Sequence, residues 1–316
     1  MGHLAIPRDR LSNFRELGHG EFGKVMLAEA RGITQGSEVT VAVKTLPDEP
    51  PINGKKDLMR ELDLMTTLPY NPYVVRLLGF SVEEDPPYII LEYLSRGDLK
   101  TLLIESRSKG AHAYDNLHGD STSLTAKQLM HFARDVADGM KFVSSQLCIH
   151  RDLAARNVLV AEDMTCKVSD FGLARDVKNM RVYEHQSGDN LPLRWMAVES
   201  LIDHTYTTES DVWSYGVLLW EIVNLGADPY PAINREEVKQ EVQSGYRMPK
   251  PKHCQQELYD MMLKCWQEKP EDRPSFAFIG NELNRLMNVG KDYISTTNYD
   301  RTVYEISDLI CEHERV

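Results

Sequence analysis

The chain has 316 residues, enough to bury a sizeable core, and its 42% hydrophobic and 27% charged residues exclude a wholly disordered protein. Lys and Arg number 36 against 48 Asp and Glu, so the formal net charge is −12. Because so acidic a surface repels phosphodiester backbones, we expect no broad binding to nucleic acid. A small nucleotide is compatible with this charge, since a local cluster of donors can oppose the global sign.

The five cysteines are scattered, with no CxxC pair and no metal-ligand spacing, which predicts free thiols packed in the core of a protein from a reducing compartment. They are Cys148, Cys166, Cys254, Cys265 and Cys311. The N-terminus lacks the cationic start and apolar run of a signal peptide. The most apolar stretch, residues 212–223, is too short to span a bilayer and contains Glu221, so we expect a soluble, intracellular chain.

The first ninety residues have the pattern of strands around one helix. Residues 57–68 repeat Leu58, Leu62 and Met65 on one helical face. The expected strands are apolar or β-branched runs bounded by turn residues, namely 25–28, 39–43, 74–78 and 88–91. Residues 92–97 then resemble a connector.

Beyond the connector the pattern is mainly helical. Residues 106–122 are polar and aperiodic, which predicts an insertion loop. The expected helices are residues 125–146, 211–224, 257–268 and 276–287, followed from residue 291 by a polar tail. The simplest arrangement is an α+β, bilobal fold, with a small β-rich lobe hinged to a larger helical lobe.

A GxGxxG pattern contributes Gly18, Gly20 and Gly23. In a dinucleotide-binding protein a helix follows this loop, but here β-patterned residues 25–27 follow, so a Rossmann-type dehydrogenase is excluded. The context favours a hairpin folded over phosphates, where glycines let the backbone approach oxygen atoms. On this motif alone, a structural glycine turn is the alternative.

Lys44 ends an apolar strand beside that loop, where its ammonium can lie against nucleotide phosphates. The alternative is a strand-end lysine whose stem covers apolar surface while its ammonium stays in water. Glu61 is the carboxylate of the following helix that fits its inward face. We therefore expect an ion pair between Lys44 and Glu61.

Residues 150–157 read HRDLAARN, and residues 170–172 read DFG. Together with the glycine loop and Lys44, in this order, they make the chain resemble the protein kinases from Leu17 to about Met287. The resemblance implies the bilobal protein kinase fold and transfer of the ATP γ-phosphate with Mg²⁺, or Mn²⁺ in its place. It implies these parts: a juxtamembrane remnant or chain start (1–13), an N-lobe (14–91), a hinge (92–97), a C-lobe (98–290, with an activation loop at 170–199) and a tail (291–316).

By the same resemblance, Asp152 accepts or orients the proton of the attacking hydroxyl, and Asn157 and Asp170 offer oxygen ligands to Mg²⁺. His150 and Phe171 are expected to stack and to set the direction of Asp170. A loop cap at Asp152 and a turn aspartate at Asp170 are the structural alternatives. The implied adenine site comprises the side chains of Leu17, Val25, Ala42, Leu91 and Leu159 and the backbone of Glu92 and Leu94.

The acceptor is expected to be tyrosine. Ala154 stands where serine/threonine kinases carry a lysine, and this chain has an arginine two residues later, Arg156. Residues 191–196 resemble the substrate platform of tyrosine kinases, receptor-type ones in particular. A phenol reaches farther from its backbone than a serine hydroxyl, so its main chain must lie farther from the catalytic aspartate. Pro192 offers the ring an apolar surface, with Trp195 in the same platform, and Arg156 supports the hydroxyl end.

Tyr183 is the one tyrosine between residues 170 and 199 and resembles the activation-loop phosphorylation site. Arg151 or Arg175 is expected to pair with its phosphate, and an exposed tyrosine without regulatory effect is the alternative.

The end of the loop reads Ala197-Val198-Glu199, without the family's proline. Glu199 is expected to pair with Arg273. Asp211 resembles the buried residue that supports the catalytic loop, which is the segment 150–157.

The resemblance also suggests partners and a location. Tail tyrosines Tyr293, Tyr299 and Tyr304 are candidate docking sites for phosphotyrosine-binding adaptor domains. Self-association is expected for trans-phosphorylation, with protein tyrosines as substrates. The chain is expected to be the cytoplasmic domain of a single-pass plasma-membrane receptor. A nonreceptor tyrosine kinase is one alternative, and a kinase-fold scaffold without catalysis is the other.

Overall fold

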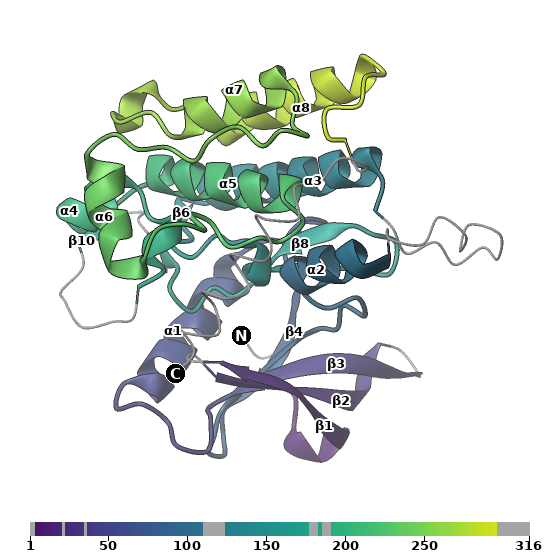
Figure 1. Cartoon of the computed structure of the whole chain (residues 1–316). Coiled ribbons are helices and arrows are strands. Elements are labelled where there is room, and N and C mark those ends of the chain that lie inside the picture. The colour runs from purple at the N-terminus through teal and green to yellow at the C-terminus, as the bar shows by residue number, and fades with distance from the viewer. Residues whose placement is uncertain are drawn as a thin grey trace.

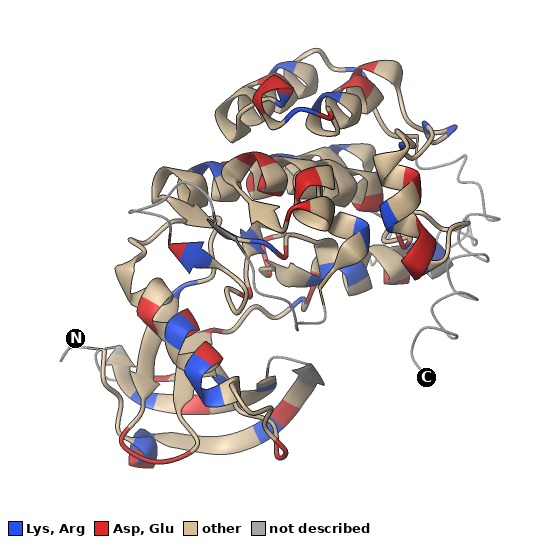
Figure 2. Cartoon of the chain, turned by 90° about the vertical axis from the view of Figure 1, so that its left-hand side faces the viewer, with Lys and Arg blue, Asp and Glu red and all other residues tan. Residues whose placement is uncertain are grey.

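A computed structural model describes residues 4–20, 23–34, 37–109, 124–176, 183–184 and 191–295. The molecule has two lobes, one built on a sheet and one mainly helical, as the sequence predicts (Figure 1). Basic and acidic residues are interspersed along the elements of both lobes, so the acidic residues are not gathered on one element (Figure 2). Among the described helices, none is long and apolar enough to cross a membrane.

The small lobe is a five-stranded antiparallel sheet with one helix, α1 (Gly54–Thr67), beside it. The strand order is β1-β2-β3-β5-β4, with β1 at Leu11–Gly20, β2 at Gly23–Thr34, β3 at Ser37–Thr45, β4 at Leu77–Ser81 and β5 at Tyr88–Glu92. Helix α1 buries Leu58, Leu62 and Met65, the stripe that its periodicity predicts, and it also buries Glu61.

The strand expected at residues 74–78 is wrongly placed, because β4 begins only at Leu77. Val74 and Val75 are extended, but they pair with Val168 of the large lobe, where the Val75 N–H donates to the Val168 carbonyl at 2.9 Å. The β-branched run is therefore a link between the lobes and not a sheet strand.

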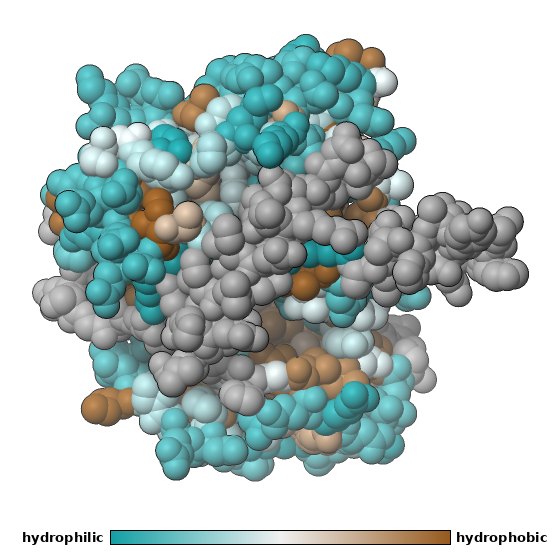
Figure 3. Space-filling view, viewed as in Figure 1, coloured by the Kyte–Doolittle hydropathy of each residue, from teal (hydrophilic) through white to brown (hydrophobic). Residues whose placement is uncertain are grey.

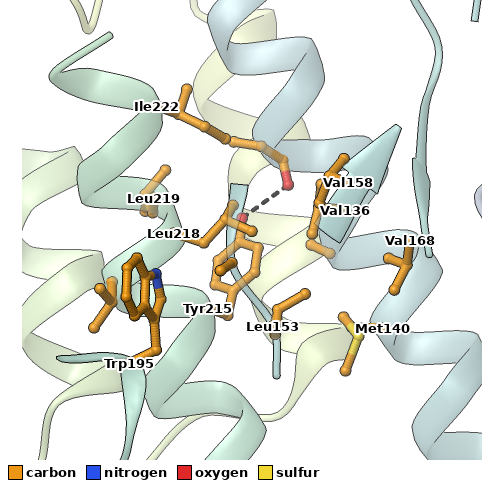
Figure 4. Close-up of a cluster of buried hydrophobic side chains, with 14 of the residues drawn as sticks. Val136, Met140, Leu153, Val158, Val168, Trp195, Tyr215, Leu218, Leu219 and Ile222 are labelled. Atoms are coloured by element: carbon orange, nitrogen blue, oxygen red, sulfur yellow. Dashed lines mark hydrogen bonds between the residues drawn. The ribbon is translucent and has the colours of Figure 1, made fainter. Parts of the chain in front are cut away.

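The large lobe is built around α5 (Thr208–Val223), in which every residue from 210 to 223 is buried. A helix that is apolar on all sides belongs in the centre of a core. Helix α5 packs against α3 (Ala126–Ser145) and α7 (Gln256–Cys265), and the Tyr215 hydroxyl donates to the Ala133 carbonyl at 2.8 Å. Figure 4 shows this cluster, with Leu218 and Ile222 of α5 beside Val136 and Met140 of α3.

Further helices complete the large lobe, and short strands hold its loops. The helices are α2 (Leu99–Lys109), α4 (Val198–Ile202), α6 (Arg235–Gln243) and α8 (Phe276–Asn288). The strands are β6 (Cys148–Ile149), β7 (Val158–Val160), β8 (Cys166–Val168), β9 (Arg175–Asp176), β10 (Tyr183–Glu184) and β11 (Thr205–Tyr206). The four predicted helices are present with small shifts at their ends, whereas α2 and α6 were not predicted.

Helix α2 extends through residue 109, so the first residues of the expected insertion loop are helical. Residues 110–123 lie outside the described part of the chain. The four cysteines among the described residues are free and buried, as expected, and Cys311 lies outside them.

Two segments that flank the lobes are attached to them. Near the N-terminus, Ala5 forms a parallel bridge with Phe80 of the edge strand β4, and the Ile6 side chain joins the small-lobe core. After α8, Tyr293 and Ile294 are buried, and the Tyr293 carbonyl accepts the Gln255 N–H at 2.9 Å. Tyr293, at the start of the segment predicted to be a polar tail, is therefore held against the large lobe by apolar contacts.

Candidate active site

Lys44 is the meeting point of the two lobes. Its Nζ lies 2.7 Å from Glu61 Oε2 on α1 and 2.8 Å from Asp170 Oδ1, which comes from the large lobe. Strand β3 places the lysine, and the buried stripe of α1 turns Glu61 inward toward it. The structure thus contains the expected Lys44–Glu61 pair and adds Asp170 to it.

The charges of this cluster support one another. Burial by itself lowers the pKa of Lys44, but the charges of Asp170 and Glu61 outweigh it and raise the pKa above its usual value. Burial raises the pKa of Asp170, but the Lys44 ammonium outweighs it and lowers the pKa. Burial also raises the pKa of Glu61, and here Lys44 offsets it only in part. Lys44 therefore stays cationic and Asp170 anionic near neutral pH.

The segment 150–157 is held from below by α5. Asp211 Oδ2 accepts the His150 N–H at 2.8 Å, and Asp211 Oδ1 accepts the Arg151 N–H at 2.9 Å, as expected for a buried support. The His150 ring lies 5.2 Å from the Phe171 ring, centroid to centroid, so the expected contact exists. Arg151 has φ 70° and Asp170 has φ 60°, a region that non-glycine residues rarely adopt and that is found at functional sites.

Asp152 is buried and held from two sides. Asn157 Nδ2 donates to Asp152 Oδ2 and to the Asp152 carbonyl, both at 2.7 Å, and Arg156 forms an ion pair with Asp152 Oδ1. Burial raises the pKa of Asp152, and the Arg156 charge opposes this. A carboxylate with a raised pKa is a better proton acceptor than a solvated one, and its orientation is fixed here.

Asn157 and Asp170 have the donor chemistry of a site for a hard divalent cation. Because the Asn157 amide nitrogen donates to Asp152, its Oδ1 is the atom left for a cation. Asp170 Oδ1 accepts from Lys44 and from the Gly172 N–H, which leaves its second oxygen for the same purpose. Oxygen ligands of this kind suit Mg²⁺.

The glycine hairpin joins β1 to β2, with Gly18 opposite Val25 and Gly20 opposite Gly23. Gly23 has φ +155°, and a Cβ there would lie 2.7 Å from the Thr45 carbonyl oxygen, so only glycine fits beside β3. Residues 21–22, at the tip, lie outside the described residues.

The residues expected to contact adenine come from both lobes, and hydrophobic surface is visible between the lobes in the space-filling view (Figure 3). Ala42 pairs with Leu91 in the sheet, and Leu159 belongs to β7 of the large lobe. Leu17 is 45% exposed on β1, and Leu94 is buried in the connector. The Glu92 N–H donates to the Arg76 carbonyl at 3.0 Å.

The expected substrate platform contacts the catalytic loop. Pro192 precedes a 3-10 turn, Leu193–Trp195. The Arg156 guanidinium lies 4.3 Å from the centroid of the Trp195 ring, a cation–π distance. One arginine thus links Asp152 to the platform.

Glu199 and Arg273 form the expected pair, with two parallel hydrogen bonds of 2.7 and 2.8 Å. The Arg273 side chain is fully buried and also donates to the Glu209 carbonyl at 3.0 Å. Val198, in place of the family's proline, begins α4, so the pair forms without that proline.

The backbone of Tyr183 pairs with Tyr206 in a two-stranded ribbon, and its side chain lies outside what the structure describes. The Arg151 guanidinium lies 4.2 Å from the Tyr206 ring and donates to the Leu173 carbonyl. Arg175 donates to the Ala174 carbonyl at 2.8 Å. In both arginines it is Nη1 that donates to these backbone carbonyls.

Two residues at the site were not predicted. Glu221 of α5 accepts from Ala155 of the catalytic loop and from the Trp195 indole. Lys167 of β8 forms an ion pair with the Glu92 side chain at 2.7 Å. Glu221 could have been found from the sequence only as a lone carboxylate in an apolar run. No feature of the sequence identifies Lys167.

The model of the family described as protein tyrosine and serine/threonine kinase matches residues 11–283. The chain is 46% identical over 306 residues to the Tyrosine kinase receptor Cad96Ca of Drosophila melanogaster, covering 96% of this chain and 39% of that protein. It is 43% identical over 292 residues to the Fibroblast growth factor receptor of Strongylocentrotus purpuratus, covering 92% of this chain and 30% of that protein. The chain thus spans less than half the length of these relatives. With its bilobal fold and its Lys44–Glu61–Asp170 cluster, this chain belongs to the protein tyrosine and serine/threonine kinase family, and it is similar to these two receptors over most of its length.

Proposed function

We propose that this chain transfers the γ-phosphate of MgATP to tyrosine hydroxyls of proteins, as the cytoplasmic catalytic domain of a single-pass receptor. The observation that carries the proposal is the arrangement of Asp152, Arg156 and Trp195, in which one arginine binds the carboxylate and covers the platform ring. The Lys44–Glu61 pair, intact beside Asp170, argues against a catalytically silent scaffold.

On the nucleotide side, the glycine hairpin covers the phosphates and the Lys44 ammonium lies against them. Adenine lies between the apolar side chains of the two lobes, with its amino group donating to the Glu92 carbonyl and its ring accepting from the Leu94 N–H. Asn157 and Asp170 would hold a divalent metal through their oxygen atoms, and such a metal would neutralise phosphate charge.

In the transfer itself, the phenolic oxygen forms a bond to the γ-phosphorus while the bond from that phosphorus to the β–γ bridging oxygen breaks. The phenolic proton passes to the Asp152 carboxylate, which Asn157 and Arg156 hold in place. ADP leaves with the electron pair of the broken bond. Positioning and charge stabilisation supply the rate, because phosphoryl transfer needs little covalent chemistry from the protein.

Tyrosine is the acceptor that suits this platform. Arg156, at the level of the Trp195 ring, supports the developing charge at the end of a long phenol, and Pro192 supplies an apolar edge. Phosphorylation of Tyr183 by a second copy of the chain regulates the activity. Tyr299 and Tyr304 are the tail tyrosines proposed to dock adaptor domains, since Tyr293 is buried.

The test is incubation with MgATP and a peptide library in which tyrosine and serine acceptors are mixed, with the phosphorylated residue identified by mass spectrometry. Wild type is expected to label tyrosine, and Asp152→Asn to abolish the labelling. Asp163→Asn is the matched control, because Asp163 is an exposed turn residue. Phosphate on serine alone, or full activity of Asp152→Asn, would refute the proposal.

A further inference from the structure

We propose that Glu221 is a positioning residue that fixes the Trp195 platform to the catalytic loop, so that a tyrosine ring on the platform stays in register with Asp152. This inference rests on the proposed tyrosine transfer and deepens it. It concerns the central helix α5, from which Glu221 reaches both segments.

One oxygen of Glu221 makes both connections. Glu221 Oε2 accepts the Ala155 backbone N–H at 3.0 Å and the Trp195 Nε1–H at 2.9 Å. The residue is fully buried, with 0% of its surface exposed. Ala155 belongs to the catalytic loop and Trp195 to the platform, so a single rigid side chain ties two segments forty residues apart in the chain.

The two connections continue to the reacting groups. Arg156 follows Ala155 directly, lies 4.3 Å from the Trp195 ring centroid and pairs with Asp152. A displacement of the Trp195 ring therefore moves the arginine that orients Asp152. Glu221 therefore supports a connected set of three residues, namely Asp152, Arg156 and Trp195.

A buried carboxylate in an apolar helix is costly and calls for a specific reason. Its second oxygen, Oε1, has no hydrogen-bond partner among the described residues, and burial raises the pKa of the group. The charge of Lys100, the two N–H donors on Oε2 and the charge of Arg156 together compensate its burial in part. Helix α5 fastens the same two segments at other points, since Asp211 holds the start of the loop and the Ser214 hydroxyl donates to the Trp195 carbonyl at 2.8 Å.

Comparing Glu221→Gln with Glu221→Leu distinguishes the role of the acceptor oxygen from the role of the negative charge. Glutamine keeps an oxygen for both donors, whereas leucine leaves both N–H groups without a partner. We expect Glu221→Leu to lower kcat/KM for a tyrosine peptide on the order of 10²-fold while the KM for ATP changes less than about twofold. Glu221→Gln is expected to stay within about threefold of wild type. An equal loss on the ATP side, or an equal loss in both variants, would overturn the inference.

Trp195→Phe tests the same contact if Glu221→Leu folds poorly. This substitution removes the indole N–H donor and keeps an aromatic ring. This variant is expected to lower peptide kcat/KM without changing the KM for ATP. Combined with Glu221→Leu, it is expected to add little, since both remove the same contact. Multiplicative losses would show independent roles and overturn the inference. Wild type without tyrosine transfer would instead refute the proposed function, so the two failures are distinguishable.

Discussion

The Glu61 carboxylate lies 2.7 Å from the Lys44 ammonium, and both side chains are almost fully buried. This contact joins α1 to β3, and because Lys44 also contacts Asp170, it couples the position of α1 to the large lobe. The orientation of the Lys44 side chain thus depends on the position of α1.

Glu61→Gln is expected to break this pair and leave a buried lysine with one partner. Removing one charge of a buried pair leaves the other charge buried without full compensation. The free energy of unfolding should therefore fall on the order of 3 kcal/mol. Phosphotransfer kcat/KM should fall on the order of 10²-fold through misplacement of Lys44. Urea unfolding and steady-state kinetics measure the two effects. Glu282→Gln, at the exposed pair with Arg285, is the control and should change stability by less than about 1 kcal/mol.

Arg273→Lys keeps the charge but loses the forked pair of hydrogen bonds to Glu199 and the donation to the Glu209 carbonyl. Since the Arg273 side chain is fully buried, the free energy of unfolding is expected to fall by about 3 kcal/mol. Thermal and urea unfolding provide the measurement. Arg285→Lys on the surface serves for comparison, and equal effects at the two positions would contradict the importance of burial.

Asp211 gives the fold a specific pH dependence. Burial raises the pKa of Asp211 from 3.8 to about 6, despite the N–H groups of His150 and Arg151. Between these values the folded state holds a proton that the unfolded state lacks, so on account of Asp211 the free energy of unfolding falls as pH rises from about 4 to 6.

Asp211→Asn should remove this contribution while keeping one acceptor oxygen. The slope of the free energy of unfolding against pH should then be more negative in wild type than in the variant, by up to about 1.4 kcal/mol per pH unit within that window. Urea unfolding at several pH values tests it, because other carboxyl groups contribute to both proteins and cancel in the difference. Parallel curves would contradict the raised pKa.

Because Gly79 has no side chain, the N-terminal segment 4–6 can pack directly against the edge strand β4. A Cβ at Gly79 would lie 2.3 Å from Ile6 Cδ1 and 2.6 Å from the Leu4 carbonyl oxygen. Gly79→Ala is therefore expected to displace this segment, lower the free energy of unfolding by about 1–3 kcal/mol and speed limited proteolysis there. Gly18→Ala is the matched control for stability, because a Cβ at Gly18 meets nothing within 4 Å. Unchanged cleavage would show that the attachment does not depend on Gly79.

Tyr183→Phe tests regulation. We expect wild type to gain activity during preincubation with MgATP and the variant to lose that gain, since the phenylalanine accepts no phosphate to order the loop. Initial rates with and without preincubation measure this. Tyr70→Phe replaces an exposed tyrosine of the small lobe and should behave as wild type. A full gain of activity in Tyr183→Phe would refute the regulatory role.

Much of the site was predictable because kinase chemistry depends on residue types in a fixed order along the chain. Lys44, Asp152, Asn157 and Asp170 are identified by their motifs, and the structure places the four at the junction of the lobes. Local patterns also predicted α3, whose start carries the capping pair of Thr125 and Gln128. Helix α6 escaped prediction, because Val238 and Val242 are its only buried residues and give too short a stripe.

The sequence by itself therefore determined the fold class, the family and the candidates for the reacting groups, since these follow from local periodicity and ordered motifs. Only the tertiary structure decided which distant residues meet. Lys167 reaches Glu92 across 75 residues, Tyr293 packs into the large lobe, and Glu221 turns out to bind both the catalytic loop and the platform. Such contacts depend on how helices and loops pack in three dimensions, and periodicity along one element does not encode the position of another.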